Sequence, residues 1–215
     1  MDGMFSFVIK YGDEIFFSRD RFGQKPLFFF QDKKNIYLSS EIKPILKMLL
    51  KNEIFLNKEA VKKYFLENSF FSGEETFFKN IYSVKPGEHG TISNFNIIAT
   101  NYYDEKNFFK TKKSIKKKDF INIFEKNILK HLIADKKFAI ALSGGLDSQS
   151  LAHVVLSKSK IKREVMNYCI EFKGHKNSEF NEAKKFTEAY KSQINKVQID
   201  ENYIINNFGN LVQKN

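Results

Sequence analysis

The sequence predicts a mixed α/β and α+β protein made of two partial domains, an antiparallel portion followed by a parallel one. Up to residue 104, short apolar runs such as "MFSFVIK", "IFFSRD" and "PLFFFQ" are separated by turn signals, which is typical of antiparallel strands. Beyond residue 118, short strand patterns alternate with longer helical ones, which is typical of parallel βαβ units. The expected domains are residues 1–110 and 111–215.

In the first domain, the run "IYLSS" adds a further strand before a helix that should begin near Glu41, with Pro44 tolerated in its first turn. A second helix is expected at residues 57–70 with Asn57 as its N-cap. The segment "YSVKPGEHGTIS" places a Pro-Gly turn between two extended stretches, and "IIATNYYD" closes the domain as a strand.

The second domain follows a lysine-rich connection at residues 104–118 that lacks a strong apolar period. Its expected helices are residues 119–133, 147–159, 178–192 and 202–213, and its expected strands are residues 138–142, 164–172 and 194–199. Helices of this length between strands should cover a parallel sheet.

The net charge of +11 does not indicate a nucleic-acid partner. Base-edge and bidentate phosphate contacts favour arginine, whereas lysine supplies nearly all of this charge and the arginines are Arg19, Arg21 and Arg163. Abundant Lys, Asn, Ile and Phe together with absent Trp suggest an AT-rich genome. The single cysteine, Cys169, lies in an apolar run and excludes an internal disulfide. With neither a membrane-spanning stretch nor a secretory signal, a cytoplasmic protein without a membrane partner is expected.

The segment "AIALSGGLDSQS" at residues 139–150 is the best candidate site. Ser143, Gly144 and Gly145 follow a strand and open a helix, so backbone N–H groups and the positive end of the helix dipole converge there. Glycine allows close approach of an anion, and the hydroxyls of Ser143 and Ser148 can donate to phosphate. No Lys follows the glycines, which excludes the common GxxxxGK nucleotide loop.

Asp147 stands at the start of that helix, where its carboxylate would repel bare phosphate unless a cation intervenes. We therefore interpret Asp147 as a partner for Mg²⁺ bound to a nucleotide pyrophosphate. The alternative is a plain Gly-Gly turn that needs no ligand, with Asp147 only stabilising the helix N-terminus.

The string "LSGGLDS" resembles the pyrophosphate loop of the N-type ATP pyrophosphatases. Around it, "HLIADKKFAIALSGGLDSQSLA" is similar to the start of the synthetase domain of glutamine-hydrolysing asparagine synthetases. The segments "DGMFSFVIKYGDEIFFSRDRFGQKPLFFF", "YLSSEIKPIL" and "SVKPGEHGTIS" resemble the last part of that family's glutaminase domain, in the same order. The resemblance implies an antiparallel α/β/β/α glutaminase portion of the Ntn type, followed by a parallel ATP-pyrophosphatase portion.

The resemblance also implies residue roles. Leu142 and Ile170 would flank the adenine and ribose of ATP, and the pyrophosphate would be held by Ser143, Gly144, Gly145, Leu146, Asp147 and Ser148. Asp147 would also contact Mg²⁺. Glu179 and Glu182 lie in the helix after the second strand of this domain. They either have a direct role in the site or only form a solvated acidic first turn of that helix.

The family reaction implied is ATP-dependent amidation of aspartate through a β-aspartyl-AMP intermediate, with ammonia from glutamine. The expected partners are therefore the small molecules ATP, aspartate and glutamine. The parent enzyme is expected to form a homodimer. One alternative is a related amidotransferase that amidates the carboxylate of a sugar or a peptide. Another is a non-catalytic remnant that only mediates an interaction.

The sequence also departs from the family pattern. The family's nucleophile is an N-terminal cysteine, whereas Asp2 follows Met1 here, so no catalytic residue is assigned. Cys169 belongs to a strand of the other domain and does not replace it. The expectation is a truncated piece, inactive alone, with the aspartate-binding segments lying beyond Asn215.

Overall fold

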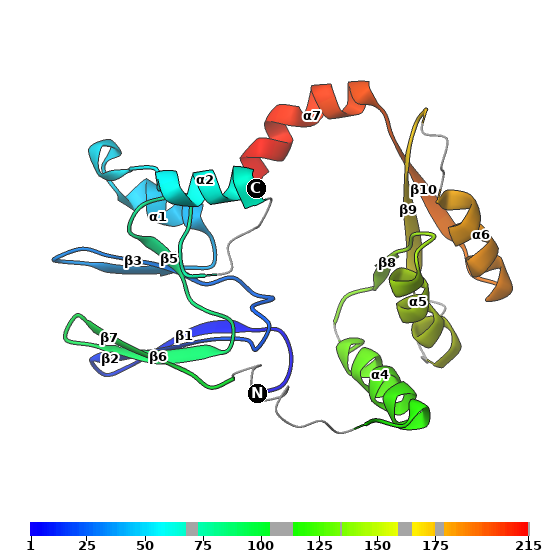
Figure 1. Cartoon of the computed structure of the whole chain (residues 1–215), viewed down its shortest axis with the longest axis horizontal. Coiled ribbons are helices and arrows are strands. Elements are labelled where there is room, and N and C mark those ends of the chain that lie inside the picture. The colour runs from blue at the N-terminus through cyan, green and yellow to red at the C-terminus, as the bar shows by residue number, and fades with distance from the viewer. Residues whose placement is uncertain (68–72, 104–113, 134, 159–164, 175–178, 215) are drawn as a thin grey trace. The chain divides into compact units, whose positions relative to one another are not determined.

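The computed structural model describes residues 1–67, 73–103, 114–133, 135–158, 165–174 and 179–214 (Figure 1). The chain forms two compact units, Met1–Lys113 and Ser114–Asn215, each with its own core. The predicted boundary between residues 110 and 111 lies outside the described residues, as do residues 68–70 of the second expected helix.

The first unit contains two antiparallel sheets. Its strands are β1 (Ser6–Tyr11), β2 (Glu14–Arg19), β3 (Phe28–Gln31), β4 (Ile36–Ser39), β5 (Ile81–Ser83), β6 (Glu88–Ser93) and β7 (Asn96–Asn101). Its helices are α1 (Ile42–Met48), the short 3₁₀ helix η1 (Lys51–Glu53) and α2 (Lys58–Glu67). The strand orders are β1-β2-β6-β7 and β4-β3-β5.

The two sheets pack face to face, and α1 covers the far side of the smaller one (Figure 1). Phe17 and Ile92 of the larger sheet join Leu27 and Val84 in the core between the sheets. On the other side of β3, Phe30 and Ile81 pack against Ile45 of α1. Alternation along the strands therefore sends apolar side chains to both faces of the β4-β3-β5 sheet, which accounts for its phenylalanine-rich sequence.

The local signals of the sequence explain the ends of several elements. Asn57 is the N-cap of α2, since its Oδ1 accepts the N–H of Ala60 at 3.2 Å, and Pro44 lies in the first turn of α1 as predicted. Between β6 and β7, Asn94 and Phe95 both have positive φ, 49° and 61°. Two consecutive residues of this kind form the tight hairpin turn whose twist matches that of the strands.

Arg19 and Asp20 hold the loop between β2 and β3 in place. The Arg19 guanidinium donates to the carbonyls of Gly23, Lys25 and Val84 at 2.5 to 2.9 Å. The Asp20 carboxylate, which is 1% exposed, accepts three N–H groups at 2.8 to 3.1 Å, from Phe22, Gln24 and Lys25. Burial opposes ionisation of Asp20, but these bonds outweigh it and lower its pKa below the ordinary value.

The second unit is built on a parallel sheet of order β10-β9-β8. Its elements are α4 (Lys117–His131), β8 (Ala139–Ala141), α5 (Leu146–Lys158), β9 (Met166–Phe172), α6 (Phe180–Ala189), β10 (Ile194–Ile199) and α7 (Glu201–Lys214). Helix α4 begins two residues before the expected start at residue 119. The parallel pairing predicted from the alternation of elements is confirmed.

The two faces of this sheet differ. On one face, Ile140 and Cys169 pack with Ala152 and Val155 of α5 and Ala183 of α6. On the opposite face, four large apolar side chains are exposed: Met166, Ile170 and Phe172 of β9 and Val197 of β10. The described part of the second unit thus has an open apolar sheet face, although parallel sheets are ordinarily covered on both sides.

The structure confirms the mixed α/β character predicted from the sequence, with antiparallel sheets in the first unit and a parallel one in the second. Across the described residues, no helix combines the length and the low polarity that a membrane crossing requires.

Asp20→Asn should destabilise the first unit, because an amide nitrogen cannot accept the backbone N–H groups that a carboxylate oxygen accepts. We expect a loss of about 1–3 kcal/mol in the free energy of unfolding at pH 7, measured by urea denaturation. The folded-state pKa is lowered, so this stabilisation is present above the unfolded pKa of about 3.9 and is lost as the pH falls through the folded pKa.

The matched control is Asp13→Asn in the exposed turn between β1 and β2, which should change stability by less than about 0.5 kcal/mol. Equal losses for the two variants, or a loss for Asp20→Asn that stays constant down to pH 2, would contradict the role assigned to the Asp20 carboxylate.

Candidate functional site

The turn between β8 and α5 forms the candidate site, and a buried residue fixes its starting point. Leu142 follows β8 directly, its side chain is 2% exposed in the core, and its N–H donates to the Tyr168 carbonyl at 2.8 Å. This bond extends the pairing with β9 by one residue. The chain then leaves the sheet at Ser143, at the carboxyl end of β8.

The loop that follows is closed by two serine hydroxyls. The Ser148 Oγ accepts the Ser143 N–H at 3.1 Å and lies 2.9 Å from the Ser143 Oγ. The Gly145 N–H donates to the Ser143 Oγ at 3.1 Å. The Ser148 Oγ is also 3.2 Å from the carbonyls of Ser143 and Gly145. The structure therefore brings together Ser143, Gly145 and Ser148, which the sequence analysis assigned to one site.

Helix α5 begins at Leu146, so the positive end of its dipole lies at this loop. The first N–H groups of a helix have no partner within the helix and can bind an anion. Asp147 is exposed in the first turn. The described residues hold no cluster of three or more His, Cys, Asp or Glu suited to a metal. A lone carboxylate still fits Mg²⁺, which usually binds one or two carboxylates, substrate phosphate and water.

Leu142 and Ile170, the two residues expected to flank the nucleoside, lie on opposite faces of the sheet. The side chain of Leu142 is in the core, so this side chain offers no surface to a ligand. Ile170 of β9 is 54% exposed on the open apolar face. Tyr168 pairs with Ala141, the last residue of β8, and Ile170 follows two residues later on β9. Ile170 therefore lies near the carboxyl end of β8.

Glu179 and Glu182 lie beside the loop. A Cβ placed on Gly144 would be 3.4 Å from the Cβ of Glu182 and 3.6 Å from that of Glu179. These two residues therefore bring acidic side chains to the border of the candidate site. Glu182 also forms an ion pair with Lys185 at 2.8 Å. Residues 175–178, which precede this helix, lie outside the described part of the chain.

Sequence reasoning missed Gln149, the residue after Ser148. Its Nε2 donates to the Gly144 carbonyl at 3.3 Å, and its backbone N–H donates to the Gly145 carbonyl at 3.2 Å. The available signal was its spacing, because a long amide side chain one turn into the helix can reach back over the preceding loop.

Cys169 is buried and lies on β9 in the second unit. Burial, reinforced by the nearby carboxylates of Glu179 and Glu171, raises the pKa of its thiol. A raised thiol pKa reduces the thiolate, which is the nucleophilic form. The structure therefore places Cys169 in a core role and gives it no feature of a reactive cysteine.

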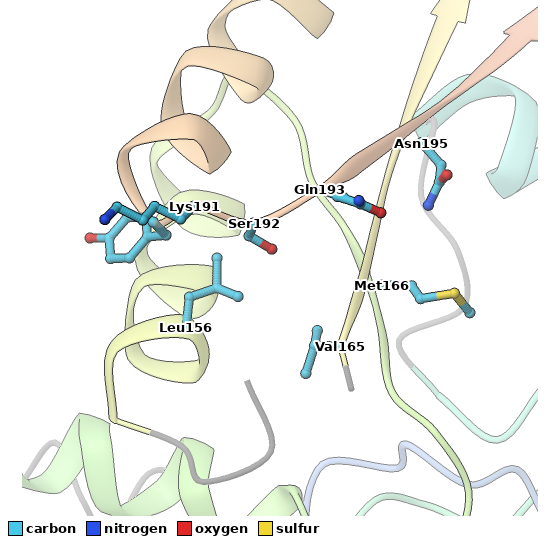
Figure 2. A pocket seen from close by; sticks show the side chains of 8 residues that line it. Leu156, Val165, Met166, Lys191, Ser192, Gln193 and Asn195 are labelled. Carbon is cyan, nitrogen blue, oxygen red and sulfur yellow. The ribbon is translucent and has the colours of Figure 1, made fainter. Parts of the chain in front are cut away.

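A cavity of about 690 Å³ lies at the amino ends of β9 and β10 (Figure 2). Its described lining includes Leu156, Met166, Ser192 and Asn195, and none of its described lining residues belongs to the loop. The side chain of Asn167 supports one wall by donating to the Ser192 Oγ and the Gln193 carbonyl at 2.9 and 2.8 Å. This cavity and the candidate site therefore lie at different ends of the sheet.

Comparison with known proteins identifies the two units. A glutamine amidotransferase domain family matches residues 1–103, and an asparagine synthase family matches residues 120–213. The chain thus falls in the class of proteins that join these two domains in this order. Within that class, it belongs to the family of glutamine-hydrolysing asparagine synthetases.

Three curated relatives illustrate the similarity. Asparagine synthetase [glutamine-hydrolyzing] 1 of Bacillus subtilis is 30% identical over 156 residues, covering 71% of this chain and 24% of the relative. Asparagine synthetase [glutamine-hydrolyzing] 2 of the same organism is 27% identical, covering 74% and 23%. Amidase chry2 of Gibberella zeae is 26% identical, covering 96% and 33%. The chain spans about a quarter to a third of the length of these relatives.

Ser148→Ala should loosen the loop, because the Ser143 N–H loses its acceptor. We expect a cost of about 1 kcal/mol in unfolding free energy and faster hydrogen exchange at the Ser143 amide, read by NMR. The matched control is Ser150→Ala, two residues along the same helix, which should leave Ser143 exchange unchanged. Equal exchange in the two variants would contradict the bond to Ser148.

The Cys169 thiol should not react with a disulfide reagent in the native chain, and should react fully in concentrated urea. The physical reason is its burial and raised pKa. Ser157→Cys in a Cys169→Ala background provides an exposed thiol near the end of α5 as a control for the reagent. Stoichiometric native labelling of Cys169 at the control's rate would overturn this assignment.

Proposed function

We propose that the second unit binds the pyrophosphate of Mg-ATP at residues 143–148 and belongs to a glutamine-dependent asparagine synthetase of the ATP-pyrophosphatase type. The observation that carries this proposal is the Ser-Gly-Gly turn at the carboxyl end of β8, closed by the Ser148 hydroxyl at the N-terminus of α5. The two serine hydroxyls lie 2.9 Å apart beside the first turn of α5, and hydroxyl groups next to a helix N-terminus suit an anion.

Each group has a defined task in this proposal. The helix N–H groups and the two serine hydroxyls bind phosphate oxygens, and the Asp147 carboxylate holds Mg²⁺. The bound cation would offset charge on the departing pyrophosphate. Ile170 offers an apolar surface to the nucleoside, and Leu142 contributes only backbone. By donating to developing negative charge, the loop would favour transfer of AMP to the side-chain carboxylate of aspartate.

The first unit, at residues 1–110, is proposed to be part of an Ntn-type glutaminase domain, and residues 111–215 part of a synthetase domain. In the complete enzyme, the glutaminase domain would release ammonia from glutamine for the synthetase domain. Three layers support this assignment within the first unit: helix α1, the β4-β3-β5 sheet and the β1-β2-β6-β7 sheet. The substrates of the complete reaction would be glutamine, aspartate and ATP.

A second candidate function is amidation of a different carboxylate. The specific support is that a relative similar to 96% of this chain, Amidase chry2, carries a name other than asparagine synthetase. The loop at residues 143–148 would bind pyrophosphate in the same way for either acceptor. The acceptor therefore has to be identified by assay, comparing AMP formation with aspartate against formation with other carboxylates.

Asp147→Asn tests the metal role. The native chain should bind Mg-pyrophosphate weakly, with a millimolar Kd, or about −4 kcal/mol, in titration calorimetry. Removing the carboxylate charge should abolish the magnesium-dependent part of this binding, while circular dichroism and the melting temperature stay unchanged. The cause is loss of the negative charge that holds the cation.

Asp200→Asn is the matched control, because Asp200 also stands at a helix start, where its Oδ1 accepts the Tyr203 N–H of α7 at 2.8 Å. Its Mg-pyrophosphate binding should equal that of the native chain. Absence of binding by the native chain would refute the pyrophosphate site. Unchanged magnesium dependence in Asp147→Asn would refute only the metal role.

A further inference from the structure

Gln149 bonds to both glycines of the candidate loop. Its side-chain amide donates to the Gly144 carbonyl at 3.3 Å, and its backbone N–H donates to the Gly145 carbonyl at 3.2 Å. The side chain is half-buried on α5. Two consecutive carbonyls of a Gly-Gly turn are therefore tied to one residue of the helix.

The bond from the Gln149 side chain to the Gly144 carbonyl also sets the direction of the Gly145 N–H. The Gly144 carbonyl and the Gly145 N–H belong to one planar trans peptide and point in opposite directions. Holding the carbonyl toward Gln149 therefore directs the N–H away from it, to where the Ser143 Oγ accepts it at 3.1 Å. Since glycine restricts its backbone less than any other residue, a peptide between two glycines has little intrinsic preference for this orientation.

Helix α6 lies close to Gly144. The α carbon of Gly144 lies against the first turn of α6, where a Cβ added to it would lie 3.4 Å from the Cβ of Glu182 and 3.6 Å from that of Glu179. This proximity leaves room for little more than one carbon atom between Gly144 and α6, but it does not select which way the peptide plane faces. The side-chain bond from Gln149 does make that selection.

We propose that Gln149 is a positioning residue for phosphate. By holding the Gly144 carbonyl, it aims the Gly145 N–H at the place where an oxygen of the ligand replaces the Ser143 hydroxyl as acceptor. Gln149 acts through this peptide and does not itself touch the ligand. This inference rests on the proposed function, because it assigns the loop N–H to a phosphate oxygen.

The test uses Gln149→Met, which keeps the length of the side chain and removes its donor. Binding of Mg-pyrophosphate to the full chain should weaken about tenfold in titration calorimetry. The Gly145 amide should shift in the ¹⁵N spectrum and exchange faster, while the melting temperature remains within about 2 °C of the native value. Gln149→Ala is the second variant, because alanine has the highest helix propensity and also lacks the donor.

Gln31→Met is the matched control. Gln31 makes the same type of bond in the first unit, where its Nε2 donates to the Phe95 carbonyl at 2.8 Å. Its pyrophosphate binding and its Gly145 amide should equal those of the native chain. Native-like binding by a folded Gln149→Met or Gln149→Ala would overturn the positioning role and leave the pyrophosphate site intact. Absence of binding by the native chain would instead overturn the proposed function, and this inference with it.

Discussion

The hydrogen bond from the Leu142 N–H to the Tyr168 carbonyl, together with burial of the Leu142 side chain, is the constraint on which the candidate site depends. It fixes the residue at which the chain stops pairing with β9. On the other side of the turn, Ala152 and Val155 pack α5 against the same core. With both ends of the turn anchored in one core, the intervening serines and glycines are held in a defined geometry by short-range bonds.

In the first unit, the loop between β2 and β3 is held in a different way. Between β2 and β3 the chain has few apolar residues to bury, and the loop is held by the Arg19 guanidinium and the Asp20 carboxylate. Multiple hydrogen bonds to charged groups can replace a core where the backbone must bend repeatedly, because each such bond is stronger than one between neutral groups. The two units therefore illustrate two ways of ordering a loop, by anchoring its ends and by bonding along its length.

The parts of the structure that follow from local pattern could be predicted from the sequence. Alternating apolar runs indicated the strands, Asn57 indicated the start of α2, and Ser-Gly-Gly after an apolar run located the candidate loop. Tertiary relations could not be predicted in this way. The approach of Glu179 and Glu182 to Gly144 depends on how α6 crosses the sheet, and the bond from Gln149 depends on a side-chain conformation.

The open apolar face of the parallel sheet has a consequence for the colloidal behaviour of this chain. Met166, Ile170, Phe172 and Val197 form a surface that water solvates poorly. The net charge of +11 opposes contact between two such surfaces, because like-charged molecules repel one another at low ionic strength. Salt at about 0.1 M shortens the range of that repulsion to about 10 Å without weakening the apolar attraction. Solubility of the chain should therefore be governed by ionic strength, and dilute buffer should keep it dispersed better than concentrated salt.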